Sequence, residues 1–221
     1  MIKAISLTKV FRTESVETTA LNGINLEINE GEFLAIMGPS GCGKSTLLNL
    51  LGLLDNPTDG ELWFLGQEVS QYTENSRTDL RNGNIGFVFQ SFHLINSLNV
   101  LDNVELPLLY RNSTAKSRRE AAVKVLEKVG LSHRMRHFPT QLSGGQCQRV
   151  ALARAIVGNP QIILADEPTG NLDSRTSSDV LGLLKVTSQK FHQTIVMITH
   201  NNEIAQLAGC IIRIEDGRIS K

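Results

Sequence analysis

Short apolar runs recur along the chain between segments of helical character. Residues 24 to 28 alternate between apolar and polar side chains, as a half-buried strand does. Continuous apolar runs occur at 33–37, 85–89, 162–165, 195–199 and 211–214. Runs of this length are typical of parallel strands that are covered on both faces. Because helical patterns separate most of them, the sequence predicts an α/β fold with a parallel sheet.

Helical periodicity follows the first of these runs and dominates a long central region. A leucine repeat starts near Gly43 and stops at Asp55, which predicts a helix directly after the strand at 33–37. The repeat consists of Leu47, Leu50, Leu51 and Leu54. Between about residues 91 and 158 the pattern is helical, with Gly130 as a helix stop. We therefore expect one domain with an inserted helical lobe.

Composition and charge narrow the classes of protein. The 221 residues are 41% hydrophobic and 20% charged, which is typical of one ordinary globular core. The formal net charge is zero, so we expect no nucleic-acid partner and only local binding of any polyanion. The longest apolar cluster falls well short of the roughly 20 residues of a membrane-spanning helix. The N-terminus lacks a signal-peptide pattern and the three cysteines have no paired spacing, which predicts a cytoplasmic protein.

A phosphate-binding motif lies between the predicted strand at 33–37 and the predicted helix. It reads Gly38-Pro39-Ser40-Gly41-Cys42-Gly43-Lys44-Ser45 and fits GxxxxGK[ST]. Its backbone N–H groups and the N-terminus of the following helix favour binding of phosphate. In such a loop Lys44 bridges the outer phosphates and Ser45 offers an oxygen to Mg²⁺. Thr46 extends the phosphate contacts. The motif alone leaves GTPases, kinases, helicases and transport ATPases open.

Two acids end the apolar run at 162–165. Asp166 is suited to bind Mg²⁺ directly or through water. Glu167 follows at once, and a carboxylate beside the outermost phosphate can orient or deprotonate an attacking water. A solvated turn is the alternative for such a pair taken by itself. Together with the phosphate-binding loop, the pair predicts a nucleotide-hydrolysing site.

The pentapeptide at 142–146 carries a family resemblance. Leu142-Ser143-Gly144-Gly145-Gln146 resembles the signature of the ATP-binding-cassette (ABC) ATPases. Ser143 can cap a helix that runs to Val157, so that the helix N-terminus and bare glycine amides form a second anion site. In the family, the signature of one subunit covers the nucleotide on the phosphate-binding loop of another. The resemblance therefore implies an ATP-bridged homodimer, with Ser143, Gly144, Gly145 and Gln146 contacting nucleotide.

Four further positions match the family pattern, and each has a simpler alternative. Gln90 resembles the Q-loop glutamine that senses the γ-phosphate and Mg²⁺, and otherwise is a surface amide. His200 resembles the switch histidine that contacts the γ-phosphate, and otherwise is one of five ordinary histidines. Asn171-Leu172-Asp173 resembles the D-loop at the dimer interface, and otherwise is a helix cap. Phe11 occupies the place of the aromatic that stacks on adenine, and otherwise is a core residue.

The resemblance covers essentially the whole chain and implies more than residue patterns alone predict. It implies a P-loop NTPase (RecA-like) core of about residues 1–90 and 159–221, an antiparallel N-terminal β subdomain, and a helical lobe of about 91–158. The segments PTGNLDS, GFVFQSFHLI and LLNLLGLLD are similar to those of the MacB/LolD/FtsE group. That group powers lipoprotein release, macrolide or peptide export, or envelope remodelling through a membrane subunit. The resemblance thus implies an ATP hydrolase on the cytoplasmic face of the cell membrane, with a MacB- or FtsX-like permease partner.

Other classes of ABC protein are weighed against this one. Chromosome-type proteins carry long heptad arms and ribosome-acting ones carry two cassettes, and the sequence has neither. Cluster-assembly ATPases of similar size stay open. A GTPase switch requires a guanine-reading NKxD, which the sequence lacks. His93, Leu94 and residues 101–109 are the candidates for contact with a membrane subunit.

Overall fold

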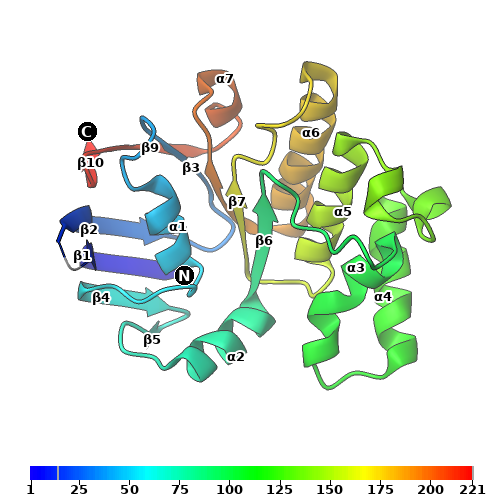
Figure 1. The fold of residues 1–221 in the computed structure, drawn as a ribbon, viewed down its shortest axis with the longest axis horizontal. Coiled ribbons are helices and arrows are strands. Elements are labelled where there is room, and N and C mark those ends of the chain that lie inside the picture. The colour runs from blue at the N-terminus through cyan, green and yellow to red at the C-terminus, as the bar shows by residue number, and fades with distance from the viewer. Residues whose placement is uncertain (14, 221) are drawn as a thin grey trace. The chain divides into compact units, whose positions relative to one another are not determined.

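The computed structural model describes residues 1–13 and 15–220 (Figure 1). They form two compact units. The first unit comprises Met1–Arg81 and Thr194–Lys221, and the second comprises Asn82–Gln193. Helix α2 (Glu74–Asn84) leads from the first unit into the second. Each unit contains strands and helices, as the α/β prediction requires.

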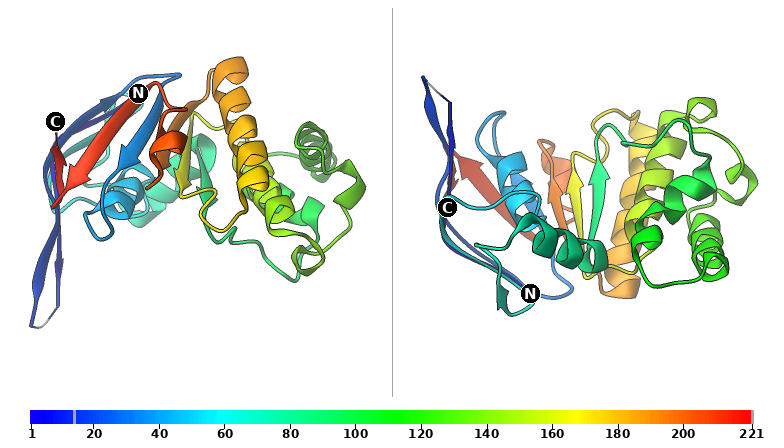
Figure 2. Two further views of the ribbon diagram at one scale, coloured as in Figure 1. Left: turned by 90° about the horizontal axis from the view of Figure 1, so that it is seen from above. Right: turned by 60° about the horizontal axis from the view of Figure 1, so that its bottom comes forward.

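A four-stranded antiparallel sheet forms part of the first unit. Its strands are β1 (Ile2–Arg12), β2 (Glu17–Ile28), β4 (Asp59–Phe64) and β5 (Gln67–Glu68). They lie in the order β2-β1-β4-β5, and Figure 2 shows the β1–β2 hairpin extending beyond the other two strands. Ile24 and Ile28 of β2 are buried, while Asn25 and Glu27 between them are exposed, as the alternation at 24–28 predicts. This alternation is what an antiparallel sheet with one solvated face requires.

The same unit contains parallel strands that end near the phosphate-binding loop. The parallel strands are β3 (Phe33–Met37), β8 (Thr194–Ile198) and β9 (Cys210–Glu215). A short strand, β10 (Arg218–Ser220), pairs with β9 in the antiparallel direction. Their order is β10-β9-β3-β8, with β3 parallel to both β8 and β9. Every residue of β3 is buried, which explains its continuous apolar sequence. The predicted strands at 33–37, 195–199 and 211–214 are thereby confirmed.

Helix α1 (Lys44–Leu51) is shorter than its leucine repeat suggests. Leu47, Leu50 and Leu51 lie buried on one helical face, as the repeat predicts. The helix ends at Gly52, and the following Leu53 has a left-handed backbone with φ 55°. The prediction that Leu54 belongs to the helix is therefore wrong, because the chain turns away before that residue. A short helix, α7 (Asn202–Ala205), follows β8.

The second unit combines two parallel strands with the helical lobe. Strands β6 (Ile85–Phe89) and β7 (Ile162–Asp166) pair in parallel, with Phe89 opposite Asp166. Its helices are α3 (Val100–Glu105), α4 (Ala115–Lys128), α5 (Gly144–Ile156) and α6 (Ser174–Phe191), and its 3₁₀ helices are η1 (Leu106–Tyr110), η2 (Ser132–Arg134) and η3 (Pro139–Gln141). No strand interrupts residues 91–158, all of which the structure describes. The predicted helical character of this region is confirmed.

The core of the helical region joins α3, α4 and α5. Val104, Leu126 and Val150 are fully buried members of one cluster contributed by these three helices. Helix α5 also packs closely on β6, since a Cβ at Gly86 would lie 2.3 Å from the Ala155 carbonyl oxygen. This close packing holds the C-terminal part of α5 against the start of β6.

Candidate functional site

The phosphate-binding loop joins β3 to α1, and two of its glycines cannot be replaced without a steric clash. Gly38 has φ 151°, and a Cβ there would lie 2.2 Å from the Ile214 carbonyl oxygen. Gly43 has φ 104°, and its Cβ would lie 2.4 Å from the Ala20 carbonyl oxygen. Side chains at either position would clash with backbone and strain the loop. The loop conformation thus depends on the two glycines that the motif requires.

The side chain of Lys44 is held in this loop by hydrogen bonds from its amine to backbone carbonyl oxygens. Its Nζ donates hydrogen bonds to the carbonyl oxygens of Gly38 at 2.8 Å and Pro39 at 2.7 Å, and lies 3.8 Å from Cys42 Sγ. Only 8% of Lys44 is exposed. Ser45 is exposed on the first turn of α1, directly after it. The positive charge and the helix N-terminus therefore belong to one small region, which favours a bound polyphosphate.

His200 shares a sheet edge with the loop. It follows β8 by two residues, and β8 pairs in parallel with β3, whose end leads into Gly38. The Thr199 N–H donates to the Ile36 carbonyl oxygen at 3.2 Å, which fixes the chain just before His200. Because the carboxyl ends of parallel strands lie at one edge, the first unit brings His200 and the loop to the same side of its sheet.

Phe11 lies at the end of β1 with 47% of its surface exposed. The Lys9 ammonium sits 5.2 Å from the centre of its ring, a cation–π contact. The alternative interpretation of Phe11 as a core residue is therefore wrong. Its ring is accessible for stacking, as the adenine hypothesis requires.

In the second unit, Gln90, Asp166 and Glu167 lie at the carboxyl ends of two paired strands. Gln90 directly follows Phe89 of β6, and Phe89 pairs with Asp166 of β7. Asp166 and Glu167 are half-buried. Glu167 has a left-handed backbone, with φ 43°. That conformation is uncommon for residues other than glycine, but Leu53 and Asp216 also adopt it in turns, so it leaves the solvated-turn alternative open.

The signature residues begin α5 with a reciprocal cap. Ser143 Oγ accepts from the Gln146 N–H at 3.3 Å, and Gln146 Oε1 accepts from the Ser143 N–H at 3.0 Å. Ser143 and Gly144 are exposed at this helix N-terminus, whereas Gly145 is buried. The helix predicted from Ser143 to Val157 is confirmed. Cys147 is buried, and burial raises the pKa of its thiol, which keeps it protonated and unreactive near neutral pH.

Gly145 has a packing role of its own. A Cβ at this position would lie 1.9 Å from Thr176 Cγ2 on α6, so a side chain there requires Thr176 to rotate or the two helices to shift. We expect Gly145→Ala to lower the free energy of unfolding by about 1–3 kcal/mol through overpacking. Urea unfolding followed by circular dichroism measures this loss. Adding Thr176→Ser, which removes Cγ2 and keeps the hydroxyl, should restore most of it.

Gly182→Ala on α6 is the matched control for this prediction. Nothing lies within 4 Å of a Cβ at Gly182, and alanine favours a helix over glycine by roughly 1 kcal/mol. The control should be neutral or stabilising. An equal loss of stability in both variants would show that crowding against Thr176 is not the cause.

Asp173 caps α6, so the helix-cap interpretation of this residue is confirmed. Its carboxylate accepts from the Thr176 hydroxyl at 2.6 Å and from the Thr176 N–H at 3.0 Å. The side-chain hydrogen bond from Thr176, followed by the backbone one, lowers the pKa of Asp173. Asn171, two residues before the cap, is exposed. Its side chain bonds Gln90, a contact between residues 81 positions apart that sequence reasoning missed.

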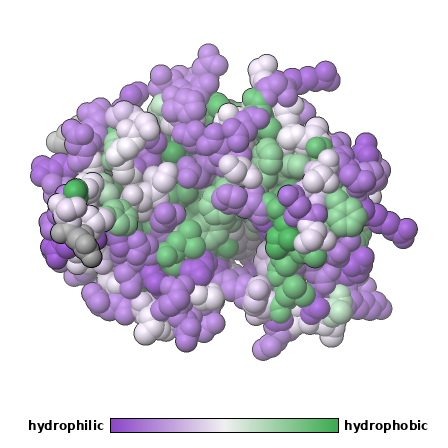
Figure 3. All heavy atoms as spheres, viewed as in Figure 1, coloured by the Kyte–Doolittle hydropathy of each residue, from purple (hydrophilic) through white to green (hydrophobic). Residues whose placement is uncertain are grey.

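Exposed apolar side chains gather on the surface around α3 and η1, and Figure 3 shows hydrophobic atoms over this part of the chain. Ile95, Leu109 and Tyr110 form what we call the α3–η1 patch, and Tyr110 is 80% exposed. Asn103 of α3 ties the segment together, because its side chain accepts from the Ile95 N–H at 2.8 Å and donates to the Ile95 carbonyl oxygen at 3.0 Å. Leu109 and Tyr110 lie towards the start of β6, where the Asn82 side chain donates to the Tyr110 carbonyl oxygen at 3.2 Å, whereas Gln90 follows the other end of that strand.

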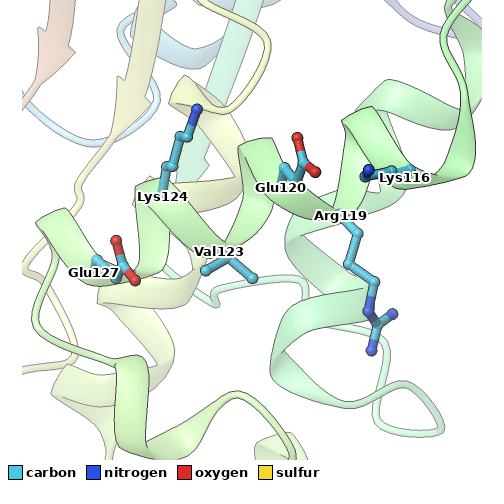
Figure 4. Close-up of a pocket in the computed structure, with 6 residues that line it drawn as sticks. All are labelled: Lys116, Arg119, Glu120, Val123, Lys124 and Glu127. Atoms are coloured by element: carbon cyan, nitrogen blue, oxygen red, sulfur yellow. The ribbon is translucent and has the colours of Figure 1, made fainter.

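An open pocket lies along α4, away from the motif residues. Figure 4 shows its lining, all of it from this one helix: Lys116, Arg119, Glu120, Val123, Lys124 and Glu127. Basic and acidic side chains are mixed, so the pocket has no net preference for an anion or a cation. We assign it no ligand.

Comparison with known proteins agrees with this geometry. The profile of the ABC transporter family matches residues 21–170. An uncharacterized ABC transporter ATP-binding protein of Methanocaldococcus jannaschii is 52% identical over 219 residues, covering 99% of this chain and 97% of that protein. The macrolide export ATP-binding/permease protein MacB of Chlorobium luteolum is 51% identical over 218 residues, covering 97% of this chain and 32% of MacB.

A solved structure extends the likeness to three dimensions. The ATP-binding cassette MJ0796, in a dimeric post-hydrolysis state bound to ADP and Pi, superposes with a TM-score of 0.92 at 44% identity. The match covers 100% of this chain and 97% of that one, and it confirms the predicted P-loop NTPase fold with an antiparallel N-terminal sheet. The chain therefore belongs to the ABC transporter family, as an ATP-binding cassette and ATP hydrolase.

Proposed function

We propose that ATP-driven dimerisation and hydrolysis by this cassette power a separate membrane subunit of the MacB/LolD/FtsE type. The observation that carries the proposal is the 51% identity to MacB, whose name joins an ATP-binding part to a permease and of which this chain spans 32%. In the described part of the chain, no helix has both the length and the apolarity to cross a membrane. In this proposal a separate subunit carries the permease function, and the cassette lies at the cytoplasmic face of that membrane.

The proposed chemistry is transfer of the γ-phosphoryl group of ATP to water. Lys44 and the loop amides hold the phosphates, and Phe11 stacks on the adenine. Glu167 orients the water and accepts its proton, while His200 donates to the γ-phosphate. Ser143 and Gly144 at the exposed N-terminus of α5 cover the nucleotide of a second copy, which makes ATP the bridge of a homodimer.

The proposed Mg²⁺ ligands fit that ion. Ser45, Gln90 and Asp166 offer a hydroxyl, an amide and a carboxylate oxygen, which are the hard donors that Mg²⁺ prefers. Among residues 1–13 and 15–220 no cluster of three acidic, histidine or cysteine side chains could hold a metal by itself. That suits Mg²⁺, which takes phosphate and water oxygens as its other ligands. When bound with ATP, it neutralises charge that develops on the phosphates.

The α3–η1 patch is the proposed contact with the membrane subunit. Among the sequence candidates, Leu101 and Leu108 are buried in the lobe core and are unavailable, whereas Leu109 is exposed. Ile95, at one end of the patch, follows Gln90 by five residues, so a partner bound there can act on the segment that contains Gln90. Exposed apolar side chains that gather on one surface are typical of a docking site, and the hydrogen bonds of Asn103 hold the backbone at Ile95 in place.

The test is a tagged pull-down of the Glu167→Gln protein from detergent-solubilised membranes with ATP. We expect an integral membrane subunit with a large extracytoplasmic part to copurify, because the trapped dimer presents its docking surfaces continuously. Adding Leu109→Asp and Tyr110→Asp should remove that subunit. The control is Val186→Asp, which places the same charge at an exposed apolar position on α6 and should change nothing.

Recovery of soluble partners alone would contradict the proposal. That result would favour the cluster-assembly class, which the sequence leaves open. Capture that survives the two aspartate substitutions would contradict the assignment of the patch while leaving the membrane partner in place.

A further inference from the structure

The Q-loop is held from both sides by the signature helix. Gln148 of α5 is completely buried, and its Nε2 donates to the Phe89 carbonyl oxygen at 3.3 Å, directly before Gln90. Arg154 of α5 donates to the carbonyl oxygens of Phe92 at 2.8 Å and His93 at 2.6 Å, shortly after Gln90. Hydrogen bonds from a charged donor are among the stronger ones in proteins. The backbone at Gln90 is therefore restrained, and its side chain is what can still reorient.

Asn171 of the D-loop contacts that side chain and its backbone at once. The Asn171 Nδ2 donates to the Gln90 carbonyl oxygen at 3.2 Å, and the Gln90 Nε2 donates to Asn171 Oδ1 at 3.1 Å. Gly170 leaves room for this pairing, since a Cβ there would lie 2.7 Å from Gln90 Nε2. The Asn171 side-chain amide is therefore hydrogen-bonded to both the side-chain amide and the backbone carbonyl of Gln90.

The hydrogen bonds between Asn171 and Gln90 determine which end of the Gln90 side-chain amide faces Asn171. A backbone carbonyl oxygen only accepts, so the end of Asn171 that faces it must be the NH₂ group. Asn171 then presents its oxygen to Gln90, and an oxygen selects the NH₂ end of the Gln90 amide. The remaining end of Gln90 is Oε1, the only atom of an amide that can ligate Mg²⁺.

We infer that Asn171 is a positioning residue that holds the NH₂ end of the Gln90 amide and so leaves the amide oxygen as the end that can ligate Mg²⁺. This inference rests on the proposed role of Gln90 as an Mg²⁺ ligand. Asn171 itself touches neither nucleotide nor metal. Without it, the two ends of the Gln90 amide compete for the same direction, and an NH₂ group facing a cation is repelled.

The test compares ATP affinity with Mg²⁺ and with EDTA, both measured by equilibrium dialysis in the Glu167→Gln background. The ratio of the two affinities reports the contribution of the metal without any turnover. Asn171→Ala should lower this ratio about five- to tenfold, which corresponds to the loss of one hydrogen bond or slightly more. The affinity in EDTA should stay unchanged, because the phosphate-binding groups are untouched.

A second background separates orientation from general damage. In Gln90→Glu both ends of the side chain are oxygens, so its orientation no longer matters. Because the Asn171 oxygen would face a carboxylate oxygen in this background, adding Asn171→Ala to Gln90→Glu should not lower the ratio. The matched control is Asn82→Ala, which also removes a 3.2 Å hydrogen bond from an asparagine to a backbone carbonyl oxygen, here that of Tyr110, and should leave the ratio unchanged.

Three results would overturn the inference or its basis, and they differ from one another. An unchanged ratio in Asn171→Ala contradicts the positioning role. An equal drop with Gln90 in place and in the Gln90→Glu background shows that Asn171 acts by another route. An unchanged ratio in Gln90→Ala contradicts the proposed metal role of Gln90 itself.

Discussion

Replacing Glu167 by glutamine is expected to lower ATP turnover roughly 10²- to 10⁴-fold, the usual contribution of a general base. Glutamine keeps the size of the side chain but cannot accept the proton of the attacking water. ATP binding should persist, because Lys44 and the loop glycines belong to other elements. The bound ATP should then hold two copies together. Phosphate release measures the first effect, and size-exclusion chromatography with ATP measures the second.

Glu127→Gln provides the control for loss of one carboxylate. Glu127 is exposed on α4, where Figure 4 labels it, and lies outside the motif residues. Its substitution should leave both turnover and oligomeric state unchanged. Normal turnover by Glu167→Gln would remove Glu167 from the proposed mechanism.

Replacing Lys44 by alanine is expected to weaken ATP binding roughly a hundredfold or more. A charged hydrogen bond contributes about 1.5–3 kcal/mol, and Lys44 is assigned two phosphates. The structure adds a second cause. The Lys44 amine bonds the Gly38 and Pro39 carbonyl oxygens, so its removal also loosens the loop that binds the phosphates. Equilibrium dialysis with ATP measures the loss.

Lys124→Ala is the charge-matched control for this prediction. Lys124 is exposed on α4 and should bind ATP normally when substituted. Thermal unfolding of Lys44→Ala separates weak binding from a failure to fold. A folded Lys44→Ala protein with unchanged ATP affinity would contradict the phosphate role of this lysine.

Much of the local structure follows from sequence because its causes are local. β3 is predictable since all five of its residues are apolar, which is what burial on both faces requires. The start of α5 is predictable since Ser143 and Gln146 are three residues apart and cap each other. The end of α1 is not, because the left-handed turn at Leu53 depends on what surrounds it. Helix α2 has one buried side chain, Arg77, and therefore leaves no apolar pattern to detect.

Sequence alone is enough to identify the family, the phosphate-binding loop, the acidic pair at the end of β7 and the signature helix. Each of these is a short segment whose residue types carry its chemistry. The crowding of Gly145 by Thr176, and the hold of Asn171 on Gln90 across 81 positions of sequence, became visible only in the folded chain. Such contacts depend on how distant segments pack. Packing brings together residues that no local pattern relates, and so no motif spacing records them.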